Sequence, residues 1–263
     1  MKTSILNFIL IGLLAISCKN EPKKAVQEIT PAVSNNQEKP TETNVKIVPI
    51  NHASMILELN GKTIYVDPVG GSEPYKNNPA ADIVLVTDIH GDHLDPLTLE
   101  KITSKDTKII APKAVETKLN DSLQIKTTVL DNGETTKINN IKITAVPMYN
   151  LREEAKKFHV KGRGNGYILA IGETKIYISG DTGPIPEMRT LENIDIAFVC
   201  MNLPYTMPVG AAADAVLDFA PAKVYPYHYR GKNGLSNVAE FKNIIETNNP
   251  KIEVIQLEWY PKG

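Results

Sequence analysis

The sequence predicts an α+β fold, a four-layer αββα sandwich in which two β-sheets face each other and helices cover both outer faces. Two observations lead to this expectation. Short apolar segments typical of strands cluster as hairpins in two separate parts of the chain. Segments typical of helices stand between the later strands, where they can cover a sheet. With 263 residues, 42% of them hydrophobic, the chain is long enough for one sizeable core.

The first group of elements begins near residue 45 and is rich in strands. The Asn60-Gly61 pair is typical of a tight hairpin turn. Asp95 and Pro96 favour a helix start, with the aspartate as N-cap and the proline in the first turn. The expected strands are 46–49, 54–59, 62–67, 83–86, 108–111, 135–138 and 141–146, and the expected helices are 96–102 and 112–119.

The second group repeats this style without repeating the sequence. Residues 172–173 join two strands as a hairpin, and the turn at 180–182 ends the second of them. An Ala-rich segment over residues 208–219 favours a helix. The expected strands are 166–171, 175–179, 194–201, 223–226 and 252–257, and the expected helices are 185–191, 208–219 and 237–247.

The first 44 residues differ from the rest of the chain. A basic start and a short apolar run predict a secretory signal peptide over residues 1–17, and an uncleaved membrane anchor is the alternative. The segment that ends at Cys18 resembles a bacterial lipobox, which is cleaved before a cysteine that becomes lipidated. Residues 18–44 have few large apolar groups and predict a flexible tether. We therefore expect a bacterial cell-envelope lipoprotein, periplasmic or anchored at the outer membrane, with one folded domain over residues 45–263.

The most informative segment is a polar run that directly follows an apolar strand. It places two imidazoles, His90 and His93, beside the carboxylates of Asp88 and Asp92. Both kinds of side chain are costly to bury unpaired, and both are good ligands for divalent transition metals. Ligands at the end of a strand are held rigidly and face solvent. The run therefore predicts a catalytic metal site.

Three further ligand candidates follow or adjoin strand-like segments, and the whole set resembles a known family. The metallo-β-lactamase-fold hydrolases carry H-x-H-x-D-H, a distant His, an Asp after S/G-G and a final His. The chain is most similar to the branch with the ascorbate-phosphate lactonase-like proteins, and the resemblance covers roughly residues 45–260. Here the signature reads Asp88-x-His90-x-Asp92-His93, then His159, Ser179-Gly180-Asp181 and His228.

The resemblance implies two divalent metal ions, with zinc as the first expectation and manganese or iron as alternatives. Carried over by position, one ion is held by Asp88, His90 and His159, the other by Asp92, His93 and His228, and Asp181 bridges them.

The chain departs from the family at Asp88, where the family usually has His. A carboxylate is a harder ligand than imidazole, so the site should tolerate manganese or iron better. The alternative is that Asp88 falls short and the first metal site is weak or absent. His159 has the alternative of a surface histidine, and the fifth histidine, His52, is expected to be structural or to support the ligands.

The implied activity is metal-dependent hydrolysis. Two ions would lower the pKa of a shared water, and the metal-bound hydroxide would attack a small ester, lactone or phosphoester. Asp92 would orient this nucleophile and relay its proton. The fold alone does not select the substrate. Candidate substrate-binding residues, which have exposed loop positions as their alternative reading, are Tyr149, Asn150, Arg163, Asn165, Tyr229 and Arg230.

Composition narrows the expected partners. The formal net charge is −1 and basic residues form only short pairs, so a nucleic-acid partner is not indicated. We expect a small-molecule substrate and, through the lipid anchor, a membrane. The alternative function is a non-catalytic, metal-stabilised binding protein displayed on the cell envelope. An open coordination position would distinguish the enzyme, because structural metal sites are closed by four protein ligands.

Overall fold

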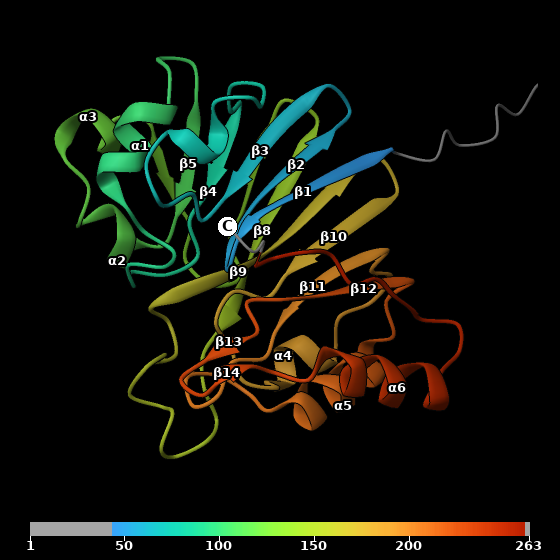
Figure 1. Ribbon diagram of the computed structural model, residues 1–263. Coiled ribbons are helices and arrows are strands. Elements are labelled where there is room, and N and C mark those ends of the chain that lie inside the picture. Colours follow the sequence, from blue (N-terminus) through green and yellow to red (C-terminus); the bar gives the residue numbers. More distant parts are fainter. Residues whose placement is uncertain (1–43, 261–263) are drawn as a thin grey trace, which may run out of the picture. The chain divides into compact units, whose positions relative to one another are not determined.

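The computed structural model describes residues 44–260 of the chain. These residues form two β-sheets packed face to face, with helices on both outer faces (Figure 1). The predicted αββα sandwich is therefore confirmed. The predicted signal peptide, the lipidated Cys18 and the tether lie outside the described residues, apart from Asn44. In the described part of the chain, no helix is both long enough and apolar enough to cross a membrane.

The first sheet has the strand order β1-β2-β3-β4-β5-β6. The strands from β1 to β3 pair antiparallel, and those from β3 to β6 pair parallel. The predicted hairpin turn at Asn60-Gly61 is confirmed, and both residues have a positive φ, as such a turn requires. The bounds are β1 (Val45–Asn51), β2 (Ser54–Leu59), β3 (Lys62–Val66), β4 (Ile83–Leu85), β5 (Lys108–Ala111) and β6 (Thr127–Val129).

The second sheet has the strand order β15-β12-β11-β10-β9-β8-β7. Its strands β10, β11, β12 and β15 are parallel, whereas β7, β8, β9 and β10 pair antiparallel. The bounds are β7 (Thr135–Ile138), β8 (Ile141–Met148), β9 (Gly164–Ile171), β10 (Thr174–Ile178), β11 (Ile196–Cys200), β12 (Lys223–Tyr227) and β15 (Glu253–Val254). A separate small hairpin consists of β13 (Arg230–Gly231) and β14 (Gly234–Leu235).

The helices divide into two groups, one on each outer face (Figure 1). The group over the first sheet has α1 (Pro96–Ile102), α2 (Lys113–Glu116) and α3 (Asp121–Gln124). The group over the second sheet has α4 (Pro186–Arg189), α5 (Val209–Phe219) and α6 (Val238–Asn248). Asp95 caps α1 as predicted, because its carboxylate accepts hydrogen bonds from the backbone N–H groups of Leu97 and Thr98. A 3-10 turn, η1, spans Glu73–Tyr75.

Successive side chains along the strands of the first sheet point to opposite faces and so belong to two separate hydrophobic cores. Ile56 and Val84 belong to the core beneath α1, α2 and α3, together with Leu99. The neighbouring Leu57 and Leu85 point the other way and join the larger core shared with the second sheet. Because successive strand residues face opposite sides, a sheet in the middle of a sandwich must be apolar on both faces. This explains the unbroken apolar runs of the sequence.

Several element boundaries differ from the predicted ones. The helix expected over 112–119 ends at Glu116, and Asn120 begins a second short helix by accepting a hydrogen bond from the Leu123 N–H. The helix expected over 185–191 has only four residues, and the strand expected over 252–257 has only two. The edge strand β6 and the hairpin of β13 and β14 were not predicted. These short elements carry too few residues to show a periodic pattern.

The topology brings the predicted ligands to one edge of the sandwich. The parallel strands β3 and β4 of the first sheet end at this edge, as do β10 and β12 of the second. The carboxyl ends of parallel strands share one edge of a sheet, where binding sites are usually built. The chain that follows each of these strands carries acidic or imidazole side chains, so the fold gathers them from two sheets.

Candidate metal centre

The loop after β4 is folded tightly enough to fix its side chains. The backbone N–H groups of His93 and Leu94 both donate to the carbonyl oxygen of His90, at 3.0 and 2.8 Å. The carbonyl oxygen of Thr87 accepts from the Asn165 N–H on β9, at 2.9 Å, which ties the loop to the second sheet. These bonds set the directions of the four candidate ligands in the loop.

The other three candidates come from loops of the second sheet. Asp181 follows β10 and His228 directly follows β12, while His159 lies in the long connection between β8 and β9. Gly180, just before Asp181, has a φ of 60°, and a Cβ at this position would lie 2.5 Å from the Met148 sulfur. Glycine is therefore required there, both for the backbone conformation and for the space.

Asp88, His90 and His159 form one group. The Asp88 Oδ2 lies 2.6 Å from the His90 Nδ1 and 3.7 Å from the His159 Nε2. One donor atom from each of the three residues falls within 4.8 Å of the others, close enough for all three to hold one ion. This is the set that the family resemblance implies for the first metal.

His93, Asp181 and His228 form a second group, and Asp92 approaches it from the loop after β4. The His93 Nε2 lies 3.5 Å from the Asp181 Oδ2, and the His228 Nδ1 lies 3.4 Å from the Asp181 Oδ1. The His228 Nε2 lies 3.3 Å from the Asp92 Oδ2. Asp181 also lies 3.2 Å from the His159 Nε2 of the first group. Its carboxylate thus faces both groups, as a bridging ligand would.

The polar atoms at this centre fit a bound cation. Among the described residues, the buried side-chain atoms that have no hydrogen-bond partner include five at this point: His93 Nε2, His159 Nε2, Asp181 Oδ1, and both ring nitrogens of His228. Buried polar groups are normally paired, so a cluster of unpaired donor atoms aimed at one another indicates a missing partner. Imidazole nitrogens and carboxylate oxygens at this spacing suit zinc, and also manganese or iron.

Two histidines are oriented through their second ring nitrogen. The His93 Nδ1 lies 2.8 Å from the Oδ2 of Asp67, a fully buried carboxylate at the end of β3. The His159 Nδ1 lies 3.2 Å from the carbonyl oxygen of Tyr205. The Asn150 Nδ2 lies 3.0 Å from the same Nδ1, but its two hydrogens go to the carbonyl oxygens of Ala155 and Tyr205. An Nδ1–H that donates to an oxygen leaves the Nε2 lone pair free for a metal. Asp67 was not predicted from the sequence.

Asp88 has a charge partner of its own. The Arg163 guanidinium donates to both carboxylate oxygens of Asp88, at 3.2 and 3.1 Å, and also to the Phe158 carbonyl oxygen. Two parallel bonds of this kind are strong and fix the carboxylate plane. The pair compensates the charge of a fully buried carboxylate, and it still leaves the Oδ2 facing the imidazole of His90.

The charges within the centre shift the pKa values of Asp181 and His93 strongly. Burial would raise the pKa of the Asp181 carboxyl, but the rings of His228, His93 and His159 outweigh it and hold that pKa well below its usual value. Burial would lower the pKa of His93, but Asp181 and Asp67 outweigh it and raise that pKa well above the usual value. A cation that binds at His93 therefore displaces a proton.

A cavity of about 200 Å³ opens beside the two groups. Its lining includes the ligand candidates His90, Asp92, His159 and Asp181, together with His52, Phe158, Asn202, Tyr205 and Arg230. Of the six predicted substrate-binding residues, only Arg230 lines it. The other five do not line it. Asn150, Asn165 and Tyr229 are buried. Arg163 is paired with Asp88, and the Tyr149 hydroxyl donates to Glu187. Phe158 also lines the cavity and was not predicted from the sequence.

Three residues at the centre have a left-handed backbone. The φ angles are 56° at His52, 45° at Asp67 and 47° at His228. Non-glycine residues adopt this region only where the surrounding structure holds them there, and such positions concentrate at functional sites. Each of the three lies immediately after a strand or in a tight turn between strands.

Comparisons with known proteins show which family and fold this chain resembles. Residues 46–228 match the family model of the beta-lactamase superfamily domain. A UPF0173 metal-dependent hydrolase from Thermococcus onnurineus is 30% identical over 224 residues, which cover 81% of this chain and 96% of that protein. The crystal structure of a protein from Parabacteroides distasonis, described as a metal-dependent hydrolase, has a TM-score of 0.74 and 41% identity, covering 83% of this chain and 94% of that one. Igni18, a metallo hydrolase from Ignicoccus hospitalis, shares the fold, with a TM-score of 0.67, 21% identity, and coverage of 81% and 94%.

Proposed function

Because the chain belongs to the β-lactamase superfamily, we propose that it is a metal-dependent hydrolase that uses two divalent ions on a small ester, lactone or phosphoester. The observation that carries this proposal is the set of buried, partnerless donor atoms around Asp181. Asp88, His90 and His159 would hold one ion, and Asp92, His93 and His228 the other, with Asp181 between them. When bound, the ions would supply an acidified water and polarise the substrate.

The residues of the chain itself supply the remaining tasks. Asp92 has a half-exposed carboxylate that borders the cavity, so it can accept a proton from an attacking water and pass it on. Phe158 and Tyr205 stand at 5.3 Å in an edge-to-face arrangement and form an apolar wall that restricts water. The opening of the cavity at the ligands supports an enzyme over a closed structural metal site.

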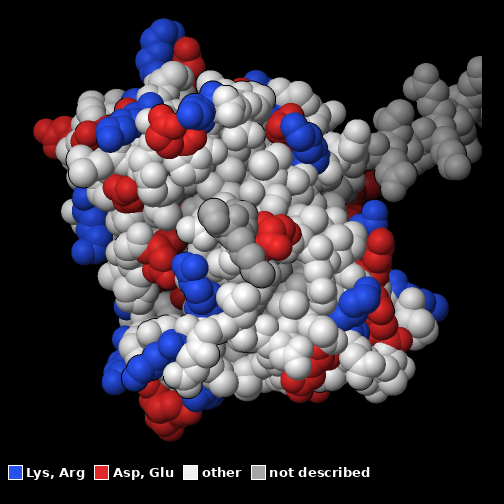
Figure 2. Space-filling model, in the orientation of Figure 1, with Lys and Arg blue, Asp and Glu red and all other residues white. Residues whose placement is uncertain are grey.

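Charge suggests that the substrate is anionic. Arg230 lines the cavity, and its guanidinium lies 4.8 Å from the centre of the Tyr260 ring. Arg163 is already held by Asp88, so Arg230 is the cation available to a ligand among the residues that line this cavity. Figure 2 shows Lys and Arg interspersed with Asp and Glu over the face drawn there, rather than gathered into one basic surface. This favours a small anionic molecule over a nucleic acid.

Metal analysis and mutation test the proposal together. The purified full-length protein should contain close to two equivalents of zinc, manganese or iron by elemental analysis. A variant with both His90→Ala and His93→Ala should lose the metal and its hydrolysis of ester, lactone and phosphodiester substrates, even with metal restored. The matched control is Asp106→Ala, which removes an exposed carboxylate that pairs with the adjacent Lys105. Unchanged turnover in the double variant would refute the assignment.

The cell-envelope location also stays a proposal. Its support is the sequence of the first 18 residues alone. Labelling with a fatty-acid analogue would detect lipid on Cys18, and a Cys18→Ser variant should release the protein from the membrane fraction.

A further inference from the structure

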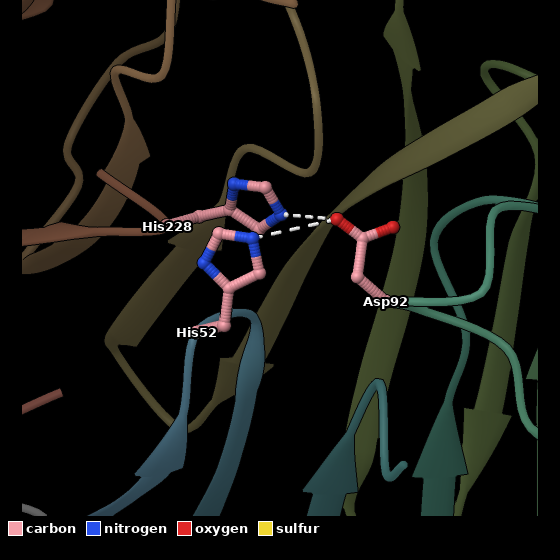
Figure 3. Close-up of side chains that lie close together, drawn as sticks. All are labelled: His52, Asp92 and His228. Atoms are coloured by element: carbon pink, nitrogen blue, oxygen red, sulfur yellow. Dashed lines mark ion pairs between the residues drawn. The ribbon is translucent and has the colours of Figure 1, made fainter. Parts of the chain in front are cut away.

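His52 lies in the turn between β1 and β2 and reaches the cavity beside two of the candidate ligands. Its ring stacks on the His228 ring with centroids 3.8 Å apart. Its Nε2 lies 3.4 Å from the Asp92 Oδ2 (Figure 3). Figure 3 shows His52 and His228 approaching the same side of the Asp92 carboxylate from different loops. On distance alone, His52 could be a third ligand of an ion held by Asp92 and His228.

The hydrogen bonds of Tyr260 decide between a ligand and a hydrogen-bond donor. The Tyr260 hydroxyl oxygen accepts from two backbone N–H groups, those of Tyr229 and Arg230, both at 3.1 Å. The same oxygen lies 2.7 Å from the His52 Nδ1. A hydroxyl that already accepts two hydrogen bonds has its own proton left to give. The O–H therefore donates to Nδ1, which must be the unprotonated nitrogen of a neutral ring.

We propose that the Tyr260 hydroxyl holds His52 in its Nε2–H form, and that His52 donates a hydrogen bond to Asp92 rather than binding a metal. A metal ligand needs a free lone pair, and the Nε2 of this form carries a proton. The bond fixes the Oδ2 edge of Asp92 and leaves Oδ1 to face the His93 Nε2, 3.9 Å away. His52 is thus a positioning residue for Asp92. Its catalytic consequence rests on the proposed function, but its protonation form does not.

Nitrogen-15 NMR of the full-length protein, without and with zinc, shows directly which ring nitrogen of His52 carries the proton. His52 should show a protonated Nε2 and an unprotonated, hydrogen-bonded Nδ1 in both samples. Tyr260→Phe should abolish this pattern, whereas the control Tyr177→Phe, which removes a buried hydroxyl with no partner, should leave it unchanged. A protonated Nδ1, or an Nε2 signal that moves to the metal-bound range with zinc, would overturn the proposal. The NMR signals report the protonation form of His52 even if the protein is inactive on every substrate tried.

Two substitutions separate positioning from metal binding. His52→Phe keeps a ring that stacks on His228 but has no donor, and His52→Gln keeps an N–H of similar reach. Zinc affinity, measured by chelator competition, should fall by no more than about 10- to 100-fold in His52→Phe and recover in His52→Gln, whereas His90→Ala should lose its zinc. Activity on a test ester should fall about 10- to 100-fold in His52→Phe and recover in His52→Gln. A loss of zinc in His52→Phe equal to that in His90→Ala would refute the positioning role.

Discussion

The replacement of Asp67 by Asn should weaken metal binding without touching a ligand. The Asp67 carboxylate is fully buried. Its Oδ1 accepts from the Thr87 N–H at 2.7 Å, and its Oδ2 faces the Thr87 hydroxyl at 2.7 Å and the His93 Nδ1 at 2.8 Å. An asparagine has the same shape but only one oxygen. The Thr87 N–H requires that oxygen, so the new NH2 group must face His93.

The consequence for His93 is a change of protonation form. Facing an NH2 group, its Nδ1 must accept a hydrogen bond, so the proton of the neutral ring moves to Nε2, the atom that faces Asp181. Before the Nε2 can bind a metal, His93 must lose the proton on this atom and give up the hydrogen bond at Nδ1. Loss of such an orienting partner costs about 10- to 100-fold in metal affinity, which is about 1.4 to 2.7 kcal/mol.

Competition with a chromophoric zinc chelator measures this affinity in the Asp67→Asn protein and its parent. Asp106→Asn is the matched control, because that carboxylate is exposed and pairs only with the adjacent Lys105 among the described residues. Near-UV circular dichroism checks that the variant is folded. A folded Asp67→Asn protein with an affinity within threefold of the parent would show that Asp67 does not orient His93.

Four further outcomes are expected. Arg163→Met should lower the free energy of unfolding of the metal-free protein by up to about 3–5 kcal/mol, because the buried Asp88 carboxylate loses its two guanidinium hydrogen bonds and keeps only the His90 and His159 rings beside it. Saturating zinc should reduce this loss in denaturant titrations. Gly180→Ala should reduce the metal content measured by elemental analysis, because the strained backbone displaces the next residue. Removal of the metal by a chelator should lower Tm, and scanning calorimetry with zinc added back should restore it. Partial burial would raise the pKa of the Asp82 carboxyl, but hydrogen bonds from the Lys62 ammonium and the Thr63 N–H outweigh it and hold that pKa below its ordinary value of 3.8. The stabilisation by Asp82 is therefore complete above pH 3.8 and is lost as the pH falls through the lowered pKa, so the Tm values of the parent and of Asp82→Asn should converge in acid.

The sequence was sufficient for the sandwich because the signals that specify it are local. The apolar runs of 83–86 and 108–111 and the turn at Asn60-Gly61 each depend on a few neighbouring residues, and the structure confirms all three to within one residue. The end of the helix expected over 112–119 was predicted wrongly because the Asn120 side chain caps the start of a new helix, α3, at that point. Such capping competes with helix propensity and is decided by tertiary packing.

The candidate ligands could be proposed from the sequence because four of them lie within six residues of one another. The residues that orient them could not, since each partner is distant in sequence. Asp67 meets His93 across 26 positions, and Arg163 meets Asp88 across 75. The sequence does hold a weak sign of the first: Asp67 is a carboxylate directly after a buried strand, the same pattern that drew attention to the loop after β4. Nothing in the sequence near Arg163 indicates that it pairs with Asp88.

The left-handed backbone at His52, Asp67 and His228 has a consequence for the amount of protein in a cell. Each such residue costs about 1–3 kcal/mol, a large share of the roughly 5–15 kcal/mol that keeps a typical domain folded. A tightly bound ion returns about 4 kcal/mol at a concentration a thousand times its Kd. When the metal ion is scarce, the less stable metal-free chain should therefore be degraded by proteases more readily. The supply of the ion would then set the amount of the protein in the cell as well as its activity.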